Sequence, residues 1–466
     1  MSKLAAKEST KLIVGLGKTG LSCARYFASL GIPFNVTDSR VDPPGLRELL
    51  GEFPDLKPEL GGFNEESFLA AGELVLSPGV SLKTPAVARA MAAGIPVTGD
   101  IDIFSRQVSA PVIAVTGSNG KSTVVSLVAA ILSAAGKNFG LGGNLDGEHG
   151  RPALDLLREK SREIYLLELS SFQLETTQSL GATVSTILNV TEDHMDRYVS
   201  MDAYLLAKQK IFCNARMVVV HQNDPLTRPP AGSDAVWLEY GMEYRGRDGF
   251  GVVSDSDSEF IVNNGQRLLA VDQLKLSGQH NIINVLAAMT LAHAAGIKMQ
   301  AIVSGVTNFA GLPDRCQWVA SINGVEFYND SKGTNVGATL AAVEGLGRKI
   351  KGRIILIAGG QGKGADFRPL RPAMEHWVRS VVLIGVDGPL IEAVLDPSLP
   401  RQYANSMQDA VELATHSAQT GDVVLLSPAC ASYDMFQDFR HRGQVFTRAV
   451  KELERITEIN KAGGLL

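Results

Sequence analysis

The chain has few cysteines and no long hydrophobic run, and both shortages narrow the classes of protein it can belong to. Its 466 residues include four cysteines, none in a Cys-x-x-Cys spacing, which argues against a disulfide framework or a zinc site and fits a reducing compartment. Apolar runs such as 126–135 stop well short of the ~20 residues that cross a bilayer. The first ten residues, MSKLAAKEST, lack an apolar signal core. We therefore expect a cytoplasmic protein with no membrane partner.

An excess of positive charge is also missing. The 44 basic and 49 acidic residues give a net charge of −5, which argues against a nucleic-acid partner because phosphate backbones attract basic surfaces. The length predicts about three domains. The apolar share of 45% is ordinary for a globular enzyme. We expect a monomer that acts on small molecules.

Short apolar runs alternate with helical stretches along most of the chain. Continuous apolar runs of this kind are typical of parallel strands covered by helices on both faces. The predicted strands are 12–14, 34–36, 74–76, 112–115, 164–167, 184–188, 217–220, 354–357, 381–384 and 423–426. The pattern indicates an α/β fold.

Two Asn-Gly pairs predict hairpins that interrupt this pattern. Residues 235–276 are interpreted as an antiparallel ribbon that turns at Asn264-Gly265, and a second hairpin is expected to turn at Asn323-Gly324. Both pairs suit a two-residue turn because asparagine and glycine tolerate positive φ.

Domain boundaries are predicted at two stretches that read as linkers, near residues 105–111 and 310–313. They divide the chain into an N-terminal domain, residues 1–106, a central domain, residues 107–311, and a C-terminal domain, residues 312–466.

Residues 116–123, TGSNGKST, follow a predicted strand and open a predicted helix. Gly117 and Gly120 let backbone N–H groups turn toward a phosphate, and the helix start adds its positive end. Lys121 can reach the outer phosphates, and the hydroxyl residues after it can offer a ligand to Mg²⁺. The loop is a shortened relative of the Walker A motif, whose first glycine is missing here. We predict a nucleotide phosphate site.

Acidic residues follow two other predicted strands. Glu168 ends the run 164–167, where a carboxylate beside a phosphate loop is a natural Mg²⁺ ligand. Residues 191–196, TEDHMD, are acidic enough to hold a cation, with a solvated loop of capping acids as the alternative. Lys208, inside the apparently helical stretch 203–212, reads on its own as a solvated lysine.

A second glycine motif, GLGKTG at residues 15–20, lies between a predicted strand and a helix. Asp38 ends the next strand, 18 residues after the last of these glycines. This spacing is the dinucleotide fingerprint, although any nucleoside diphosphate conjugate could rest on the same N–H groups. An NAD(P)-dependent oxidoreductase would not need the second phosphate loop at 116–123, which counts against that function.

Five motifs occur in an order that resembles the Mur ligase family over nearly the whole chain. They are TGSNGKST at 116–123, ELSSFQLE at 168–175, NVTEDHMDRY at 189–198, GQHN at 278–281 and DSKGTN at 330–335. The resemblance implies an ATP-dependent ligase of peptidoglycan precursor synthesis, in which a carboxylate becomes an acyl phosphate and an amine then captures it. The last motif is the most selective, and it points to members that add D-glutamate to UDP-N-acetylmuramoyl-L-alanine.

The motifs and the resemblance together predict three α/β domains. The first is a Rossmann-like domain for the UDP substrate, the second a P-loop ATPase-type domain with an antiparallel ribbon, and the third a Rossmann-like domain for the amino acid. The expected ligands are ATP, two Mg²⁺ ions, UDP-N-acetylmuramoyl-L-alanine and D-glutamate.

The resemblance also implies the residues that handle ATP and metal. The ATP contacts would be Gly117, Ser118, Asn119, Gly120, Lys121, Ser122, Thr123, Asn281, Asn284, Arg315 and Asp330. The metal ligands would be Ser122, Glu168, His194 and Lys208, and the catalytic residues Lys121, His194 and Lys208. Lys208 matches the lysine that the family carbamylates with CO₂.

The implied substrate contacts fall into two groups. The UDP substrate would meet Lys18, Thr19, Ser39, Arg40, Asn144 and His194. D-Glutamate would meet Lys332, Thr334, Lys363, Ser432 and Phe439. Lysines and hydroxyls suit an amino acid with two carboxylates.

Three alternatives stay open at this point. A folylpolyglutamate synthase shares the central and C-terminal plan but would not need the N-terminal GLGKTG domain. An NAD(P)-dependent oxidoreductase would change nicotinamide absorbance. A non-catalytic nucleotide-binding module would bind ATP without releasing phosphate.

Overall fold

The computed structural model describes residues 10–145, 150–246, 248–255, 258–276, 278–312 and 314–463. Most of the N-terminal stretch used for the signal-sequence prediction and Pro313 of the predicted second linker lie outside these residues. The chain divides into two compact units, each described by itself below. The first holds the chain up to Val190 with residues 202–274 and 283–308, and the second holds residues 191–201, 275–282 and 309 onward. No helix within the described ranges is long and apolar enough to cross a membrane.

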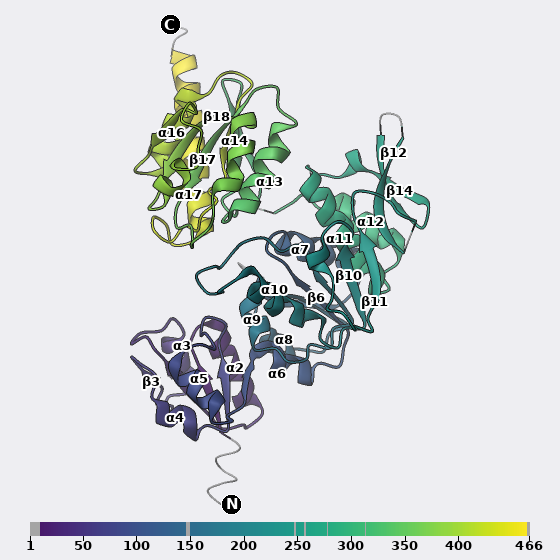
Figure 1. Cartoon of the computed structure of the whole chain (residues 1–466), viewed down its shortest axis with the longest axis vertical. Coiled ribbons are helices and arrows are strands. Elements are labelled where there is room, and N and C mark those ends of the chain that lie inside the picture. Colours follow the sequence, from purple (N-terminus) through teal and green to yellow (C-terminus); the bar gives the residue numbers. More distant parts are fainter. Residues whose placement is uncertain are drawn as a thin grey trace, which may run out of the picture. The chain divides into compact units, whose positions relative to one another are not determined.

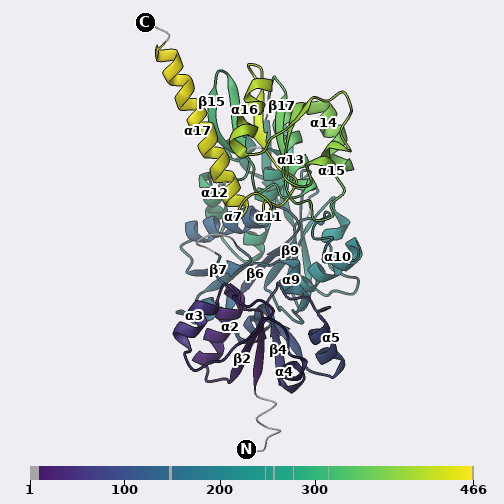
Figure 2. The same ribbon diagram turned by 90° about the vertical axis from the view of Figure 1, so that its left-hand side faces the viewer.

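The first unit begins with a five-stranded parallel sheet in the order β3-β2-β1-β4-β5. Its strands are β1 (Lys11–Val14), β2 (Phe34–Asp38), β3 (Glu59–Leu60), β4 (Glu73–Leu76) and β5 (Val97–Gly99). Its helices are α2 (Lys18–Ser29), α3 (Leu46–Glu52), α4 (Glu65–Ala70), α5 (Pro85–Ala92) and α6 (Asp100–Gln107). Figure 2 shows α2 and α3 on one side of this sheet and α4 and α5 on the other, as the continuous apolar strands predicted.

A nine-stranded sheet in the order β14-β13-β12-β11-β10-β9-β6-β8-β7 forms the rest of the first unit (Figure 1). Its strands are β6 (Val112–Thr116), β7 (Phe139–Gly143), β8 (Ile164–Glu168), β9 (Val184–Ile187), β10 (Met217–His221), β11 (Val236–Tyr240), β12 (Gly249–Asp255), β13 (Ser258–Asn263) and β14 (Gln266–Ala270). Its helices are α7 (Lys121–Ala134), α8 (Ala153–Leu157), α9 (Ser171–Glu175), α10 (Met201–Gln209), α11 (Gln279–Ala294) and α12 (Met299–Asn308). Both α10 and α11 begin with residues that cluster with the second unit.

The prediction of an antiparallel ribbon over 235–276 is wrong in its first part. β11 pairs in parallel with both β10 and β12, so only β12, β13 and β14 form the antiparallel ribbon. The register of β10 against β11 matches Val219 to Leu238, both buried, so β11 extends the parallel core.

The second unit is built on a six-stranded sheet in the order β15-β16-β20-β17-β18-β19. Its strands are β15 (Gln317–Ile322), β16 (Val325–Asn329), β17 (Ile354–Gly359), β18 (Val378–Ile384), β19 (Arg401–Tyr403) and β20 (Val423–Leu426). Its helices are α13 (Val336–Gly347), α14 (Arg371–Trp377), α15 (Gly388–Glu392), α16 (Met407–Ser417) and α17 (Phe439–Gly463).

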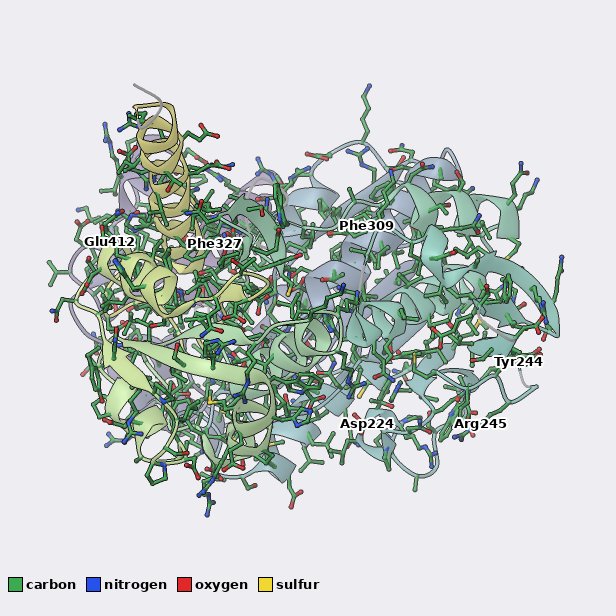
Figure 3. The ribbon with its side chains drawn as sticks, turned by 90° about the horizontal axis from the view of Figure 1, so that it is seen from above. Asp224, Tyr244, Arg245, Phe309, Phe327 and Glu412 are labelled. Carbon is green, nitrogen blue, oxygen red and sulfur yellow. The ribbon has the colours of Figure 1, made fainter. Side chains whose placement is uncertain are left out.

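Successive residues of the central strands serve two hydrophobic cores, one on each face of this sheet. Ile354 and Leu356 face a core shared with α13, α14 and α15, whereas Ile355 and Ile357 face one shared with α16 and α17. Figure 3 labels Phe327, which is buried in the second of these cores, and Glu412, which lies on the exposed side of α16. The period of two explains why the strand sequences are apolar throughout.

Both predicted hairpins are confirmed. Asn264 and Gly265 connect β13 to β14 with φ values of 47° and 77°, and Asn323 and Gly324 connect β15 to β16 with φ values of 52° and 79°. Two consecutive positive φ values are what a type I′ turn requires, and this explains the residue types.

Close packing of α12 on α7 supports the helix that starts at Lys121. A Cβ atom added to Gly305 of α12 would lie 2.6 Å from the Cα atom and 2.8 Å from the backbone nitrogen of Ile131 in α7. Backbone atoms cannot move aside as a flexible side chain can, so the helices approach this closely only with glycine at 305.

We predict that Gly305→Ala lowers the free energy of unfolding by about 1–3 kcal/mol, because the added methyl group pushes two packed helices apart. Urea denaturation would measure the change. Gly51→Ala is the matched control, since a Cβ atom at Gly51 of α3 would meet nothing within 4 Å. Helix propensity predicts that the control gains up to about 1 kcal/mol. An equal gain for Gly305→Ala would contradict the close packing.

Candidate functional site

The phosphate loop has the strand–loop–helix form that its sequence predicted. β6 ends at Thr116 and α7 begins at Lys121, with Gly120 as its N-terminal cap in the left-handed conformation at φ 82°. A Cβ atom on Gly120 would lie 2.5 Å from Oδ1 of Asn284, so both the backbone conformation and this neighbour call for glycine. Asn284, one of the expected ATP contacts, therefore lies against the loop.

Two lysines contact the same carbonyl oxygen of this loop. Lys121 Nζ donates to the carbonyl oxygens of Gly117 at 2.8 Å and Ser118 at 2.9 Å, and Lys208 Nζ donates to that of Gly117 at 2.9 Å. Two ammonium groups on one side of a loop give an electropositive surface that suits a polyphosphate.

The interpretation of Lys208 as a solvated lysine is wrong. Its side chain is 1% exposed, and Nζ lies 4.4 Å from the centre of the Tyr204 ring, one helical turn earlier in α10. The stem of a lysine can be buried on an apolar surface, and here the ammonium is buried too because the Gly117 carbonyl accepts from it. The isolated sequence around 208 carries no signal for this contact, which joins residues 91 positions apart.

Asn189, which sequence reasoning did not select, holds the loop from the neighbouring strand. Its backbone carbonyl accepts from the Ser118 amide at 3.0 Å, and its side chain exchanges two hydrogen bonds with the backbone of Asn119, at 2.8 and 3.1 Å. Asn189 follows β9, which pairs with β6. The signal in the sequence was its position just after a predicted strand, but only the acidic residues that follow it were predicted to bind a ligand.

Glu168 ends β8, between β6 and β7, and its carboxylate is buried. One oxygen accepts from the Asn144 amide at 3.3 Å, whereas Oε2 has no hydrogen-bond partner among the described residues. A buried carboxylate oxygen without a donor is costly unless it binds something. Glu168 therefore fits the predicted role of a Mg²⁺ ligand, and Asn144, expected to bind substrate, lies beside it.

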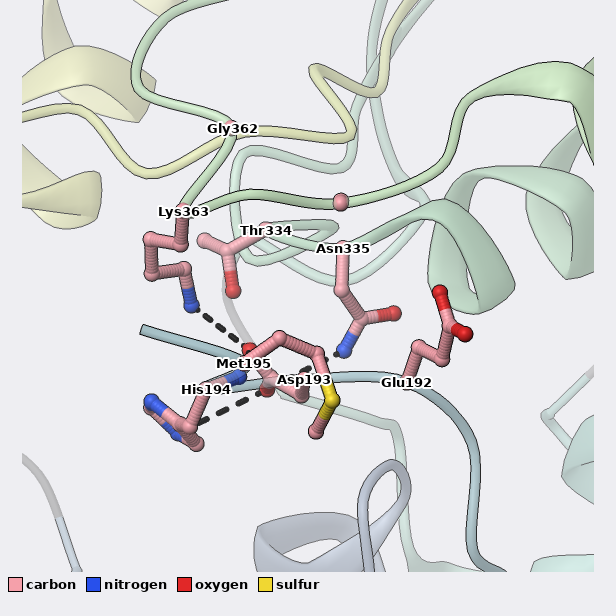
Figure 4. A pocket seen from close by; sticks show the side chains of 9 residues that line it. Glu192, Asp193, His194, Met195, Thr334, Asn335, Gly362 and Lys363 are labelled. Atoms are coloured by element: carbon pink, nitrogen blue, oxygen red, sulfur yellow. Dashed lines mark hydrogen bonds and ion pairs between the residues drawn. The ribbon is translucent and has the colours of Figure 1, made fainter. Parts of the chain in front are cut away.

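A small pocket in the second unit is lined by part of the acidic turn and by two loops of the C-terminal sheet (Figure 4). Its lining residues are Glu192, Asp193, His194, Met195, Thr334, Asn335, Gly362, Lys363 and Ala365. Asp193 lies at its centre and accepts from Lys363 Nζ at 2.7 Å and from the Asn335 amide at 3.4 Å. His194 Nε2 lies 3.6 Å from the same carboxylate.

In this arrangement Asp193 of the acidic turn is paired with protein donors, whereas in a metal cluster it would face a cation. No group of three or more His, Cys, Asp or Glu side chains in the described ranges is placed to hold a metal ion. Asp193 is held by a lysine, an amide and its neighbour's N–H. Lys363 and His194 both have positive φ, 52° and 59°, and both side chains approach the carboxylate of Asp193.

The residues expected to bind D-glutamate are brought together in part. Thr334 and Lys363 line the pocket. Lys332 Nζ lies 3.9 Å from the centre of the Phe439 ring, a cation–π contact. Ser432 is buried with 2% of its surface exposed, one residue after Ala431, which pairs with Gln361 two residues before Lys363.

Four of the six residues expected to bind the UDP substrate lie at the ends of two paired strands. Lys18 and Thr19 open α2 after β1, and Ser39 and Arg40 follow β2. Asp38 accepts from the Leu16 amide and from Arg40. Burial alone would raise the pKa of this carboxyl, but these bonds hold the pKa at about 2. Because Asp38 is committed to the protein, it is poorly placed to bind a ribose, which weakens the NAD(P) alternative.

Asp330, an expected ATP contact, is a buried carboxyl in the second unit. Burial raises its pKa to about 7, even though Ser427 Oγ donates to it at 2.7 Å and the Cys316 amide at 3.1 Å. The positive charge of Arg315, the other ATP contact expected from this domain, acts in the opposite direction to burial. A Cβ atom on Gly333 would lie 2.6 Å from Oδ2 of Asp330, so this site is tightly enclosed.

The expected site residues therefore divide between the two units. The first unit holds Lys18, Thr19, Ser39, Arg40, Gly117, Ser118, Asn119, Gly120, Lys121, Ser122, Thr123, Asn144, Glu168, Lys208 and Asn284. The second holds His194, Asn281, Arg315, Asp330, Lys332, Thr334, Lys363, Ser432 and Phe439.

The raised pKa of Asp330 predicts a loss of stability with rising pH. Below pH ~4 the carboxyl is protonated in both states, but between about 4 and 7 only the unfolded chain releases the proton, so the free energy of unfolding falls across this range and levels off above it. Urea denaturation of the wild type and Asp330→Asn would test this. The neutral variant should lack this slope, and parallel pH curves for the two proteins would contradict it.

Sequence comparisons match all three parts of the chain to known families. Residues 9–99 match the Mur ligase MurD-like N-terminal domain, residues 115–292 the Mur ligase middle domain, and residues 314–430 the Mur ligase glutamate ligase domain. The UDP-N-acetylmuramoylalanine--D-glutamate ligases of Pseudomonas fluorescens and Pseudomonas aeruginosa are each 47% identical to this chain over 450 residues. Those residues are 97% of this chain and 99% of each relative.

Solved structures with the same fold are more distant in sequence. The MurF ligase of Thermotoga maritima, determined in complex with ADP, has a TM-score of 0.61 at 14% identity and covers 96% of this chain and 99% of that one. The UDP-N-acetylmuramate-alanine ligase MurC of the same organism has a TM-score of 0.58 at 18% identity and covers 95% and 99%. These two likenesses show the fold alone. The domain matches and the 47% identity across nearly the whole chain show that it belongs to the Mur ligase family of ATP-dependent ligases.

Proposed function

We propose that this ligase joins D-glutamate to UDP-N-acetylmuramoyl-L-alanine in peptidoglycan precursor synthesis. The observation that carries the proposal is the Lys363–Asp193 contact, in which the lysine expected to bind a glutamate carboxylate already holds a carboxylate at 2.7 Å. The names of the 47% identical relatives support the same substrates. A folylpolyglutamate synthase would not need the N-terminal domain matched at residues 9–99.

The reaction would form an amide in two steps. A carboxylate oxygen of the muramoyl-alanine attacks the γ-phosphorus of ATP, ADP leaves, and an acyl phosphate forms. The amine of D-glutamate then attacks the acyl carbon, inorganic phosphate leaves with the C–O bond electrons, and the nitrogen loses a proton. Both steps depend on positioning and on neutralising phosphate charge.

The phosphate loop and Lys121 would position the phosphates of ATP and neutralise part of their charge. Loop N–H groups and the start of α7 would hold the β- and γ-phosphates, while Lys121 exchanges the carbonyl oxygens of Gly117 and Ser118 for phosphate oxygens. The remaining ATP contacts proposed are Asn281, Asn284, Arg315 and Asp330. The lysine is already poised beside the loop, so little reorganisation is needed.

Magnesium fits the first unit at Glu168, whose Oε2 is buried without a donor in the part of the chain that is described. Bound there, Mg²⁺ would neutralise phosphate charge during transfer. We propose Ser122 as a further ligand of that ion and His194 as a ligand of a second ion. Lys208 is also proposed as a metal ligand. The side chains orient the phosphates, and the cation balances their charge.

We also propose that Lys208 is carbamylated. The ammonium would lose one proton, and the resulting amine would add to the carbon of CO₂ and lose a second proton. The change converts a cation into an anion that can hold a metal. The burial of Lys208 supports a role inside the site rather than at the surface.

The substrate contacts proposed are those that the family resemblance implied. Lys18, Thr19, Ser39 and Arg40 would hold the UDP part, and Asn144 and His194 the sugar-peptide part. Lys332, Thr334, Lys363, Ser432 and Phe439 would surround D-glutamate. The domain boundaries at 106/107 and 311/312, the monomeric state and the cytoplasmic location also remain predictions.

The deciding experiment measures phosphate release from ATP and Mg²⁺ with UDP-N-acetylmuramoyl-L-alanine and one of four amino acids. D-Glutamate should support release, whereas L-glutamate, D-aspartate and L-lysine should not. Release with another amino acid would overturn the assigned substrate. ATP binding without release under any of these conditions would favour the non-catalytic module.

Lys121→Ala should reduce turnover at least ~100-fold, because it removes a charge that acts most strongly as the γ-phosphate moves. Steady-state phosphate release would measure the loss. Lys137→Ala is the control, since Lys137 follows the same helix but is exposed and paired with Glu163 at 2.9 Å. The control should keep wild-type turnover. Near-normal turnover of Lys121→Ala would rule out its assigned role.

Lys208→Ala should be inactive and should regain part of its activity with a small carboxylic acid such as acetate, which can take the place of a carbamate. The neighbouring variant Lys210→Ala serves as control, because Lys210 Nζ donates to the Glu175 carbonyl. It should stay active and be indifferent to acetate. A failure of rescue while Mg²⁺ still binds would argue against carbamylation.

A further inference from the structure

Arg442, on the first turn of α17, is a fully buried cation. Its guanidinium makes four hydrogen bonds, all to oxygens of the second unit. None of these four bonds is to a carboxylate, although buried charges are normally paired. The residue matches none of the roles that the motifs implied.

The four bonds tie together two segments that are distant in sequence. Nε donates to Oγ of Ser331 at 3.0 Å and Nη2 to the Ser331 carbonyl at 2.8 Å. Nη1 donates to the carbonyls of Cys430 at 3.1 Å and Ala431 at 3.4 Å. The rigid planar fork of one arginine therefore fixes the loop after β16 against the loop after β20.

Backbone bonds extend this link to a third loop. Ala431 exchanges two hydrogen bonds with Gln361, at 2.8 and 3.0 Å, and the Ala429 amide donates to the Gly333 carbonyl at 2.9 Å. Ser331 Oγ, which accepts from Arg442, donates in turn to the Phe439 carbonyl at 2.7 Å.

The segments held in this way are those that carry the proposed amino-acid site. Lys332 follows Ser331, Ser432 follows Ala431, Lys363 lies two residues after Gln361, and Phe439 begins the helix of Arg442. Each of the four side chains is thus within three positions of a group in the Arg442 network. A shift of that network would move all of them at once.

We propose that Arg442 is a positioning residue for the amino-acid substrate, holding the three loops in the register that the acceptor's carboxylates require. The proposal rests on the proposed function insofar as D-glutamate is that acceptor. Arg442 acts through its neighbours, because its guanidinium donates its hydrogen bonds to protein oxygens and is 0% exposed.

Its charge adds to the geometric role. Burial lowers the pKa of Arg442 to about 10, so the group stays protonated at neutral pH. Asp434, Asp330 and Asp314 act on it only from a distance and favour the charged form. The cation adds positive potential behind the loops that would hold an anionic substrate, and these three carboxylates offset part of it.

The test compares KM values of Arg442→Met, Arg442→Lys and the wild type for amino acid, ATP and muramoyl substrate. We expect Arg442→Met to raise KM for D-glutamate at least ~30-fold, which corresponds to the loss of two or more buried hydrogen bonds, and KM for ATP by less than about threefold. Arg442→Lys keeps the charge but not the fork and should recover part of the loss. Arg448→Met, an exposed position of the same helix, should behave as wild type.

A smaller variant covers the case in which Arg442→Met does not fold. Ser331→Ala removes the hydroxyl between Arg442 and the Phe439 carbonyl with little change in volume. It should raise KM for D-glutamate about fivefold, in the same direction as Arg442→Lys. Variants that are less stable to urea yet keep the wild-type KM for the amino acid would overturn the proposal.

Phosphate release by the wild type distinguishes failure of the Arg442 proposal from failure of the proposed function. If it releases phosphate with an amino acid other than D-glutamate, the assigned substrate is wrong. The same KM comparison, made with the amino acid that the wild type uses, then still decides whether Arg442 positions the acceptor site.

Discussion

The proposed nucleotide site depends on the carbonyl oxygen of Gly117, which accepts from both Lys121 and Lys208. The two ammonium groups repel each other, and the shared carbonyl dipole offsets part of this repulsion beside the phosphate loop. Asn189 holds the same loop from the next strand, and α12 supports the helix behind it. A short glycine loop is thereby kept in one shape by contacts from four separate parts of the chain.

Most of the fold was predictable from the sequence because parallel strands with two covered faces are apolar throughout. Every predicted strand overlaps an observed one, and both Asn-Gly hairpins are present. The sequence patterns missed β3, β5, β7 and β19, all of which are edge strands. β3, β5 and β19 are only two or three residues long, and β7 is mostly glycine, so none of them leaves a strong apolar pattern. β11 was misassigned because Val236 and Trp237 are exposed, which resembles a half-solvated ribbon, although the strand pairs in parallel on both sides.

The site was predictable where chemistry is local in sequence and not where it depends on distant contacts. The phosphate loop and Glu168 were predicted from a strand end and residue type, and the structure gives Glu168 a buried oxygen that fits a cation. Lys208, Asn189 and Arg442 were not found in this way, because each works through backbone atoms of a segment far along the chain. Of these three residues, only Lys208 was implied by the family resemblance. Every residue has a backbone carbonyl, so the residue type of the acceptor does not reveal such a hydrogen bond.

The same contacts explain how a protein with a net negative charge could bind anionic ligands. The chain carries a net charge of −5, yet its proposed ligands are a polyphosphate and a dicarboxylate. Lys121 is held by carbonyl oxygens and Lys363 by the carboxylate of Asp193. A phosphate or a substrate carboxylate would exchange one set of oxygens for another, so its binding need not desolvate a bare cation. Because exchange costs less than desolvation, the lysines can be placed in advance, and selectivity then depends on how well the loops around them fit the incoming oxygens.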